Sequence, residues 1–229
     1  MSKRPTFVDD LVNRPLPALT PARLSDENNT PYKKEWQDSI ADLKCHPALE
    51  SALHLMNDDL FSAHFLLRKM QEDEWAKWLH AILHQTEGDL EKNAKLWYQQ
   101  VDPAILRHYW TGDDACGEAI ENMYRIMSVK AGKADEAEET KARQIKWDEL
   151  CCVMSELEKQ HNWRVVDGTE FYTRDEDPSH KSMVLGECRV YMEMVLMPRR
   201  GISHVGQIWR FRSVVLLVSY SVWTTASRF

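Results

Sequence analysis

The sequence predicts an all-α protein of stacked helical hairpins, with a minor β element near the C-terminus. Apolar residues recur at helical spacing over most of residues 35–157, and Asp, Pro and Gly residues divide this stretch into short helices. A sequence pattern also repeats after 30 residues. We therefore expect an extended Pro-rich arm at 1–34, a helical domain at 35–187 and an atypical tail at 188–229.

Composition restricts the classes of function. The net charge of -7 argues against nucleic acid as a partner, because binding to a phosphate backbone needs a basic face. The mean hydropathy of -0.53 makes a membrane location unlikely on composition alone. The five cysteines are odd in number and irregularly spaced, which favours a reducing compartment over a disulfide framework. The first residues contain no apolar signal region, so we expect a cytoplasmic protein.

Proline is concentrated in the arm. Pro fixes φ and lacks an amide proton, so the arm should be extended. The prolines are Pro5, Pro15, Pro17, Pro21 and Pro31. Short apolar residues in the arm could lie on the domain surface; they are Phe7, Val8, Leu11 and Leu16.

Helix boundaries can be assigned from capping residues. Pro47 suits the first position of a helix, Asp58 and Asp59 can cap the next one, and Gly88 should end the helix that begins near Glu74. Further helices are expected near Glu35, after Asp89, at Pro103, over residues 114–130 and around Trp147–Leu157. The charged residues 133–146 are typical of a solvated helix or linker.

The repeat predicts two similar helical hairpins. The shared pattern is L-x-x-x-L-H-x-x-x-x-D-L, and a shift of 30 residues superimposes the two copies. It pairs Leu49 with Leu79, Leu53 with Leu83, His54 with His84, Asp59 with Asp89, Leu60 with Leu90 and Leu66 with Leu96. Chance similarity between amphipathic helices is the alternative. If the repeat is real, His54 and His84 should share a packing role.

The C-terminal part differs from the rest. Asp167-Gly168 between β-forming residues suggests a small hairpin. Residues 188–229 hold six Arg, no Lys and the single acid Glu193, and they include an uncharged run of 15 residues. A membrane span needs about 20 apolar residues, so strands or a buried segment are expected there instead. The compositional break also allows the hypothesis of a misread exon boundary.

The best candidate site is a set of histidines with one glutamate. His80, His84 and Glu87 follow one another at i, i+4 and i+7, which places them on one helix face. His54 and His64 occupy the same flank of their own helices, beside the apolar stripe. An imidazole pair one turn apart can bind a metal, with a carboxylate as a further ligand. We therefore take His64, His80, His84 and Glu87 as candidate ligands of a divalent transition metal.

Known motifs do not strengthen this assignment. The zincin motif needs Glu directly after the first histidine, and Ala81 stands there. The candidate histidines do not belong to a Glu-x-x-His motif of the kind found in di-iron bundles. Walker, G-x-G-x-x-G and G-x-S-x-G motifs are absent from the sequence. Histidines at the edge of an apolar stripe often only hydrogen-bond within a helix interface, and that alternative stays open.

A stretch of about 60 residues that includes residues 63–98 resembles a group of helical proteins from fungi and bacteria that have no assigned activity. The matching features are Ala63-His64, the H-x-x-x-H-x-x-E-G-D run from His80 to Asp89, and the A-x-x-W-Y run from Ala94 to Tyr98. The resemblance extends over about 60 of the 229 residues and does not reach the tail. It implies a helical fold and draws attention to the same histidines, but it implies no mechanism.

Two functions of different classes follow from these features. The repeat predicts a helical interaction or scaffold protein that binds a protein partner in a groove between hairpins. The histidines predict a metal-binding protein, or an enzyme with an acid/base site, that acts on a small molecule. Neither the substrate nor the partner can be identified from the sequence.

Overall fold

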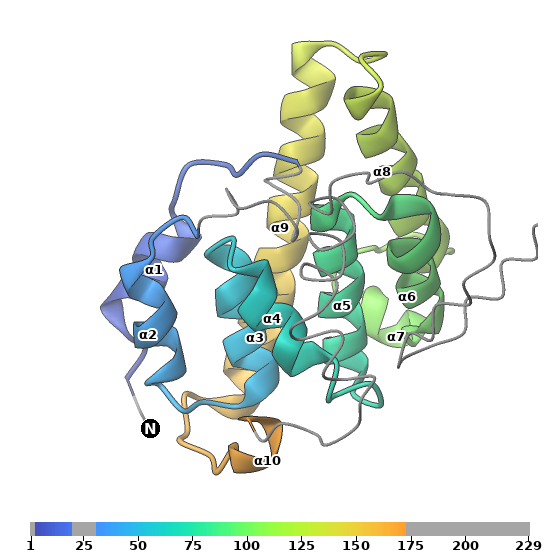
Figure 1. The fold of residues 1–229 in the computed structure, drawn as a ribbon. Coiled ribbons are helices and arrows are strands. Elements are labelled where there is room, and N and C mark those ends of the chain that lie inside the picture. Colours follow the sequence, from blue (N-terminus) through green and yellow to red (C-terminus); the bar gives the residue numbers. More distant parts are fainter. Residues whose placement is uncertain (1–2, 20–30, 173–229) are drawn as a thin grey trace, which may run out of the picture. The chain divides into compact units, whose positions relative to one another are not determined.

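The computed structural model describes residues 3–19 and 31–172, and all regular secondary structure in this part of the chain is helical (Figure 1). Residues 1–173 form one compact unit and residues 174–229 a second, which lies outside the described residues. The helices are α1 (Thr6–Val12), α2 (Glu35–Ala41), α3 (Pro47–Met56), α4 (Leu60–Leu67), α5 (Glu74–Glu87), the π-helical turn η1 (Leu90–Ala94), α6 (Lys95–Gln100), α7 (Pro103–Leu106), α8 (Ala115–Lys130), α9 (Glu136–His161) and α10 (Thr169–Tyr172).

Two hairpins form the part of the fold that carries the repeat. In the first, α3 packs against α4; in the second, α5 packs against η1 and α6. Their turns have the same geometry: the amide of Asp59 donates to the carbonyl of His54 (2.9 Å), and the amide of Asp89 donates to that of His84 (3.0 Å). Asp58 and Gly88, which the repeat superimposes, both have positive φ. The predicted hairpins are therefore present.

The two hairpins diverge after their turns because η1 contains one extra residue. The amide of Ala63 donates to Asp59, four residues back, whereas the amide of Ala94 donates to Asp89, five residues back. From this point the matching shift is 31 residues rather than 30. Tyr98 then occupies the position of Leu67, and both are fully buried. Leu96, paired with Leu66 in the sequence, is instead 51 % exposed.

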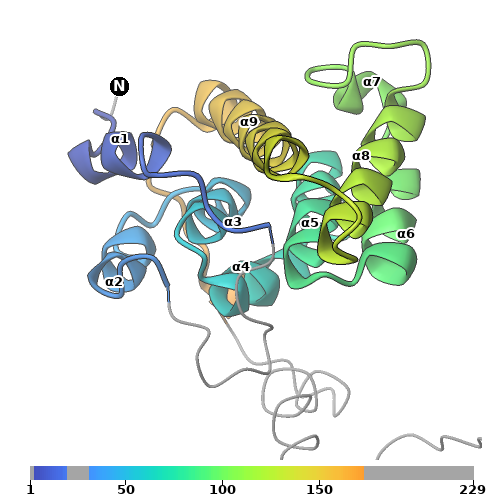
Figure 2. The same ribbon diagram turned by 90° about the horizontal axis from the view of Figure 1, so that it is seen from above.

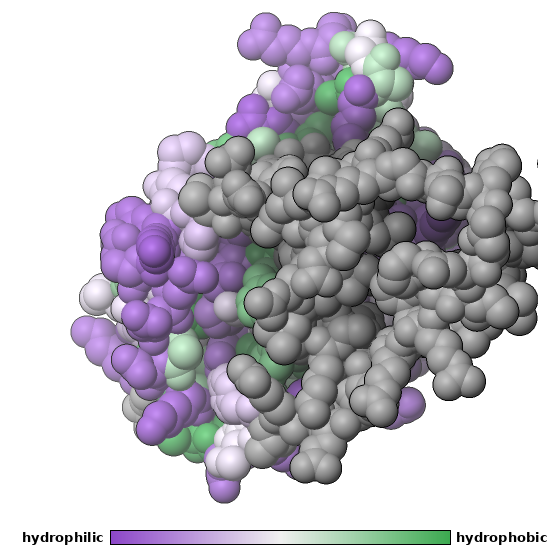
Figure 3. Space-filling view, viewed as in Figure 1, coloured by the Kyte–Doolittle hydropathy of each residue, from purple (hydrophilic) through white to green (hydrophobic). Residues whose placement is uncertain are grey.

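Helix α9 packs along both hairpins. It contacts α3 and α5 on one side and α8 on the other, as the two orthogonal views show (Figures 1 and 2). The stretch that the sequence left as a helix or linker, residues 133–146, supplies the first turns of α9, with Asp135 as its N-cap. Hydrophilic side chains cover the outer side of α1 and α2 and the turn between α8 and α9 (Figure 3).

The N-terminal arm is not extended throughout. Residues 6–12 form α1, which starts directly after Pro5. Val8 and Leu11 lie one turn apart on its inner face, are fully buried, and belong to the main core. The gain from burying these two side chains outweighs the preference of the neighbouring prolines for extended backbone. Arg14, just after α1, donates to the carbonyl of Met56 at the end of α3.

The hairpin expected at Asp167 and Gly168 does not form within the described residues. The side chain of Asp167 accepts a hydrogen bond from the amide of Thr169 (3.1 Å), which starts the short helix α10 instead. The rest of the C-terminal segment, and any β element in it, lies outside the described residues. Among the helices that can be described, none combines the length and the apolar character of a membrane span.

Candidate metal centre

Three of the four predicted site residues lie together where α4 meets α5. His64 is in the last turn of α4, and His80 and His84 are one turn apart on α5. One ligand atom from each of these histidines lies within 4.8 Å of the other two, and in the described part of the chain no other group of His, Cys, Asp and Glu side chains meets this criterion. His80 and His84 are 4 % and 8 % exposed. The two helices therefore bring three imidazoles into a largely buried cluster.

Local sequence explains why these helices hold the histidines in place. The side chain of Asp73 accepts a hydrogen bond from the amide of Ala76 (2.8 Å) and so caps the start of α5. Gly88 ends the same helix in the left-handed conformation, with φ of 84°. The side chain of Asp59 caps α4 by accepting from the amide of Ser62 (3.2 Å). Each histidine therefore projects from a helix whose ends are fixed.

Glu87 lies beside the cluster and contacts one of its members. The Nδ1 of His84 and the Oε2 of Glu87 are 2.8 Å apart, and a carboxylate can only accept, so Nδ1–H is the donor. This hydrogen bond leaves Nε2 of His84 as the atom that can bind a metal. The other carboxylate oxygen of Glu87, Oε1, is buried without a hydrogen-bond partner. Glu87 is thus placed to orient a ligand, whereas the sequence had suggested a ligand itself.

His54 is not part of the cluster. Its Nδ1 is 2.9 Å from Asp59 and its Nε2 is 3.7 Å from Glu50, so both ring nitrogens face carboxylates. Burial alone would lower the pKa of His54, but these two carboxylates outweigh it and raise that pKa. The pKa of Asp59 falls to about 2, because its bonds to His54, Gln37 and Ser62 outweigh the effect of burial. His54 therefore forms a buried ion pair and has no nitrogen left for a metal.

The environment of the cluster favours neutral imidazoles. Burial, with the nearby charges of His84 and Arg68, lowers the pKa of His64 to about 3. Burial is also the largest cause at His80, where the pKa falls to about 2. A neutral imidazole is the form that binds a metal ion, so these two residues need not lose a proton first.

A fourth ring, that of Trp97, lies against the cluster. Its centroid is 4.1 Å from that of His80, and the two planes are 15° apart, which is a stacked arrangement. The extra residue in η1 brings Trp97 to this position, because the second hairpin has Trp97 where the first has Leu66. No sequence pattern predicted this contact; the indole had entered only through the A-x-x-W-Y run from Ala94 to Tyr98.

The observed geometry is close to that of a metal site but would need adjustment. A metal with bonds of about 2.1 Å at tetrahedral angles holds its ligand atoms roughly 3.4 Å apart. The rings of His80 and His84 are stacked with planes 15° apart, while His64 is edge-on to both. A metal must lie in the plane of each ring that binds it, so one of the two stacked rings must turn about its Cβ–Cγ bond.

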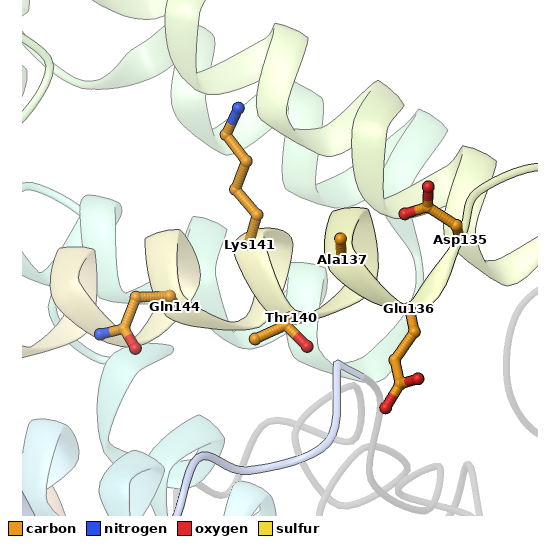
Figure 4. Close-up of a pocket in the computed structure, with 6 residues that line it drawn as sticks. All are labelled: Asp135, Glu136, Ala137, Thr140, Lys141 and Gln144. Atoms are coloured by element: carbon orange, nitrogen blue, oxygen red, sulfur yellow. The ribbon is translucent and has the colours of Figure 1, made fainter.

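A surface hollow lies at the start of α9, within the described residues. Its lining comes from the first turns of this one helix and its cap, namely Asp135, Glu136, Ala137, Thr140, Lys141 and Gln144. Figure 4 shows that these side chains diverge rather than point toward a common centre. Asp135 is already engaged in capping, since it accepts from the amide of Glu138 (2.9 Å). This hollow therefore lacks the convergent groups of a binding site.

Comparisons with known proteins add no assignment: no family model, no curated protein and no solved structure matches the chain. The resemblance to fungal and bacterial helical proteins stays an expectation. The function must accordingly be inferred from the geometry of the cluster.

Proposed function

We propose that the protein binds one divalent transition metal ion, with Zn²⁺ the best fit, through His64, His80 and His84. The observation that carries this proposal is the convergence of three imidazoles from two helices, with ligand atoms within 4.8 Å of one another. Imidazole is a preferred ligand of Zn²⁺, and three histidines are the ligand set of one class of catalytic zinc site.

Glu87 supports the proposal as the partner of a ligand. Histidines that bind metals almost always donate their other ring N–H to a carboxylate or carbonyl, which fixes the tautomer and the ring orientation. The bond from Nδ1 of His84 to Glu87 has this form. The other carboxylate oxygen of Glu87, Oε1, is buried without a partner and can accept a further hydrogen bond.

Three protein ligands leave the fourth position of a tetrahedral ion open. In catalytic zinc sites this position holds water, whose pKa the metal lowers to about 7. The chemistry that such a site supplies is hydrolysis or hydration of a small molecule. The role of this chain's own residues is to hold the ion with His64, His80 and His84 and to orient His84 through Glu87.

The alternative function, a helical interaction or scaffold protein that binds a partner between its hairpins, has less support. Such a protein needs an open groove between its hairpins, but α3 and α5 both pack against α9. The repeat itself therefore remains its only motivation in the described part of the chain.

The direct test is elemental analysis of the purified protein beside a His80→Ala/His84→Ala variant. We expect about one metal ion per wild-type chain and none in the double variant. His54→Ala is the matched control, because this histidine occupies the equivalent repeat position outside the cluster, and it should retain the metal. Circular dichroism establishes that each variant is folded. A wild-type protein that takes up no Zn²⁺, even after incubation with excess metal, would refute the proposal.

A further inference from the structure

A buried carboxylate joins the helices that carry the candidate metal centre. Glu149 of α9 is fully buried, and its Oε1 accepts from the indole nitrogen of Trp78 (2.7 Å) and from that of Trp110 (2.8 Å). The hydroxyl of Tyr98 lies 2.9 Å from the same oxygen and 3.0 Å from Oε2. Glu149 therefore connects α9 to α5, to α6 and to the segment after α7.

This arrangement requires a hydrogen-bond acceptor on α9. Indole N–H groups can only donate, so the two tryptophans require an acceptor. Burial raises the pKa of Glu149 to about 7, although its three donors and the charge of Lys146 act against this rise. An unpaired buried carboxylate would be strongly unfavourable, so the three donors stabilise both the group and the packing of the elements that supply them.

Two of the three donors are next to residues of the metal centre. Trp78 is two residues before His80 on α5, and Tyr98 directly follows Trp97 on α6. Residues this close along a helix point to different sides of it, so Glu149 and the histidines lie on different sides of these helices. Trp97 in turn stacks against the ring of His80. Fixing Tyr98 at Glu149 thus fixes the helix turn that holds Trp97 against His80.

We propose that Glu149 is a positioning residue for the metal centre, acting through Tyr98 and Trp97 on the ring of His80. This inference rests on the proposed metal binding. Trp97 restrains His80, and the bond between Tyr98 and Glu149 sets the rotation of α6 that places Trp97. The third donor, Trp110, belongs to a segment that carries no residue of the centre, so its bond to Glu149 is structural only.

The test compares two variants that each remove one donor from the same oxygen. Tyr98→Phe removes the hydroxyl on α6, and Trp110→Phe removes the indole N–H on the segment after α7. We measure the Zn²⁺ dissociation constant by competition with a chelating dye, the visible spectrum of the Co²⁺-substituted protein, and stability in urea without metal. Tyr98→Phe should weaken Zn²⁺ binding about tenfold and change the Co²⁺ spectrum. Trp110→Phe should lower stability while leaving both metal readouts unchanged.

Each outcome decides between the two roles of Glu149. Equal metal affinity in wild type and Tyr98→Phe, or equal losses in the two variants, would overturn the positioning role while leaving metal binding intact. A wild type that binds no Zn²⁺ would instead refute the proposed function, and the positioning role with it. Should Tyr98→Phe fail to fold, Trp97→Leu replaces it, since it removes the ring that stacks on His80 and leaves the three donors to Glu149 in place. That variant should also weaken Zn²⁺ binding and change the Co²⁺ spectrum, and unchanged metal readouts would overturn the proposal.

Discussion

His54 and His84 occupy the same position in two similar hairpins, yet their side chains have opposite surroundings. Both accept the amide of an Asp five residues later through their carbonyls. The ring of His54 lies between Glu50 and Asp59, whereas the ring of His84 contacts Glu87 and faces His64 and His80. The shared packing role expected from the repeat therefore holds for the backbone but not for the rings.

A substitution at one repeat position accounts for much of this difference. The 30-residue shift superimposes Glu50 on His80, and both lie one turn before the shared histidine. With Glu at this position, the two residues form a buried ion pair. With His, they form a pair of stacked imidazole rings. The same helical geometry thus gives a structural contact in α3 and a candidate ligand pair in α5.

The largest expected effect is on stability, and it separates the two histidines. His54→Ala leaves Glu50 and Asp59 buried without their cation, so it should lower the free energy of unfolding by about 3 kcal/mol. His84→Ala removes only one hydrogen bond to a carboxylate at the edge of the core, and should cost about 1 to 2 kcal/mol in the metal-free protein. Urea denaturation measures both. A larger loss for His84→Ala would contradict the assignment of structural and binding roles.

The second effect concerns metal affinity. Glu87→Gln weakens the partner of His84 and should raise the Zn²⁺ dissociation constant 10- to 100-fold, with little change in metal-free stability. Asp59→Asn is the matched change at His54: it should lower stability and leave Zn²⁺ affinity unaltered. Isothermal titration calorimetry reports the affinities. If Asp59→Asn weakens Zn²⁺ binding as much as Glu87→Gln does, the two carboxylates do not differ in role.

The smallest effect is on the pH dependence of stability, because acid should strengthen the contribution of His54 and weaken that of His64 and His80. The folded pKa of His54 is raised, so its stabilisation is complete below the unfolded value of 6.5 and is lost as pH rises through the folded pKa. The pKa values of His64 and His80 fall to about 3 and 2. Their contribution to folding stability is therefore complete above pH 6.5, the unfolded pKa, and declines as the pH falls below it.

Substitution separates these two contributions. In the metal-free protein, His54→Gln should increase the loss of stability between pH 8 and pH 5. The reason is that only the effect of His64 and His80, which lowers stability in acid, then remains. The double variant His64→Gln/His80→Gln should decrease this loss of stability between pH 8 and pH 5. Urea denaturation at pH 5 and pH 8 measures both differences. Parallel pH profiles for the two variants would show that the rings do not differ in this way.

Much of the fold followed from local chemistry. Asp59 and Gly88 fix helix ends through contacts within a few residues, so their sequence positions sufficed to place the start of α4 and the end of α5. The grouping of His64 with His80 and His84 also followed from helical periodicity. Other features depend on contacts between distant residues: α1 is stabilised by core burial of Val8 and Leu11, which outweighs the signal from nearby prolines.

The contacts around the site were harder to foresee for the same reason. Glu149 and Trp78 are 71 residues apart, and nothing in either local sequence indicates their bond. Glu87 was expected on the metal side because a helical wheel gives the direction of a side chain but not which atom it contacts. The stacking of Trp97 on His80 depends on the π-helical turn, which the repeat pattern had concealed.

That turn makes the second hairpin a phase-shifted copy of the first. One added residue rotates everything after it by about 100° on a helical wheel. If the same residues formed a regular α-helix in place of the π-helical turn, Leu96 would take the buried position of Leu66, and Trp97 would rotate away from His80. Deleting one residue from Leu90–Ala94 would instead let the turn close as an α-helix and leave Trp97 in its place. A duplicated segment can thus acquire a new contact surface by a change in helical phase, with no substitution among the residues that make the contact.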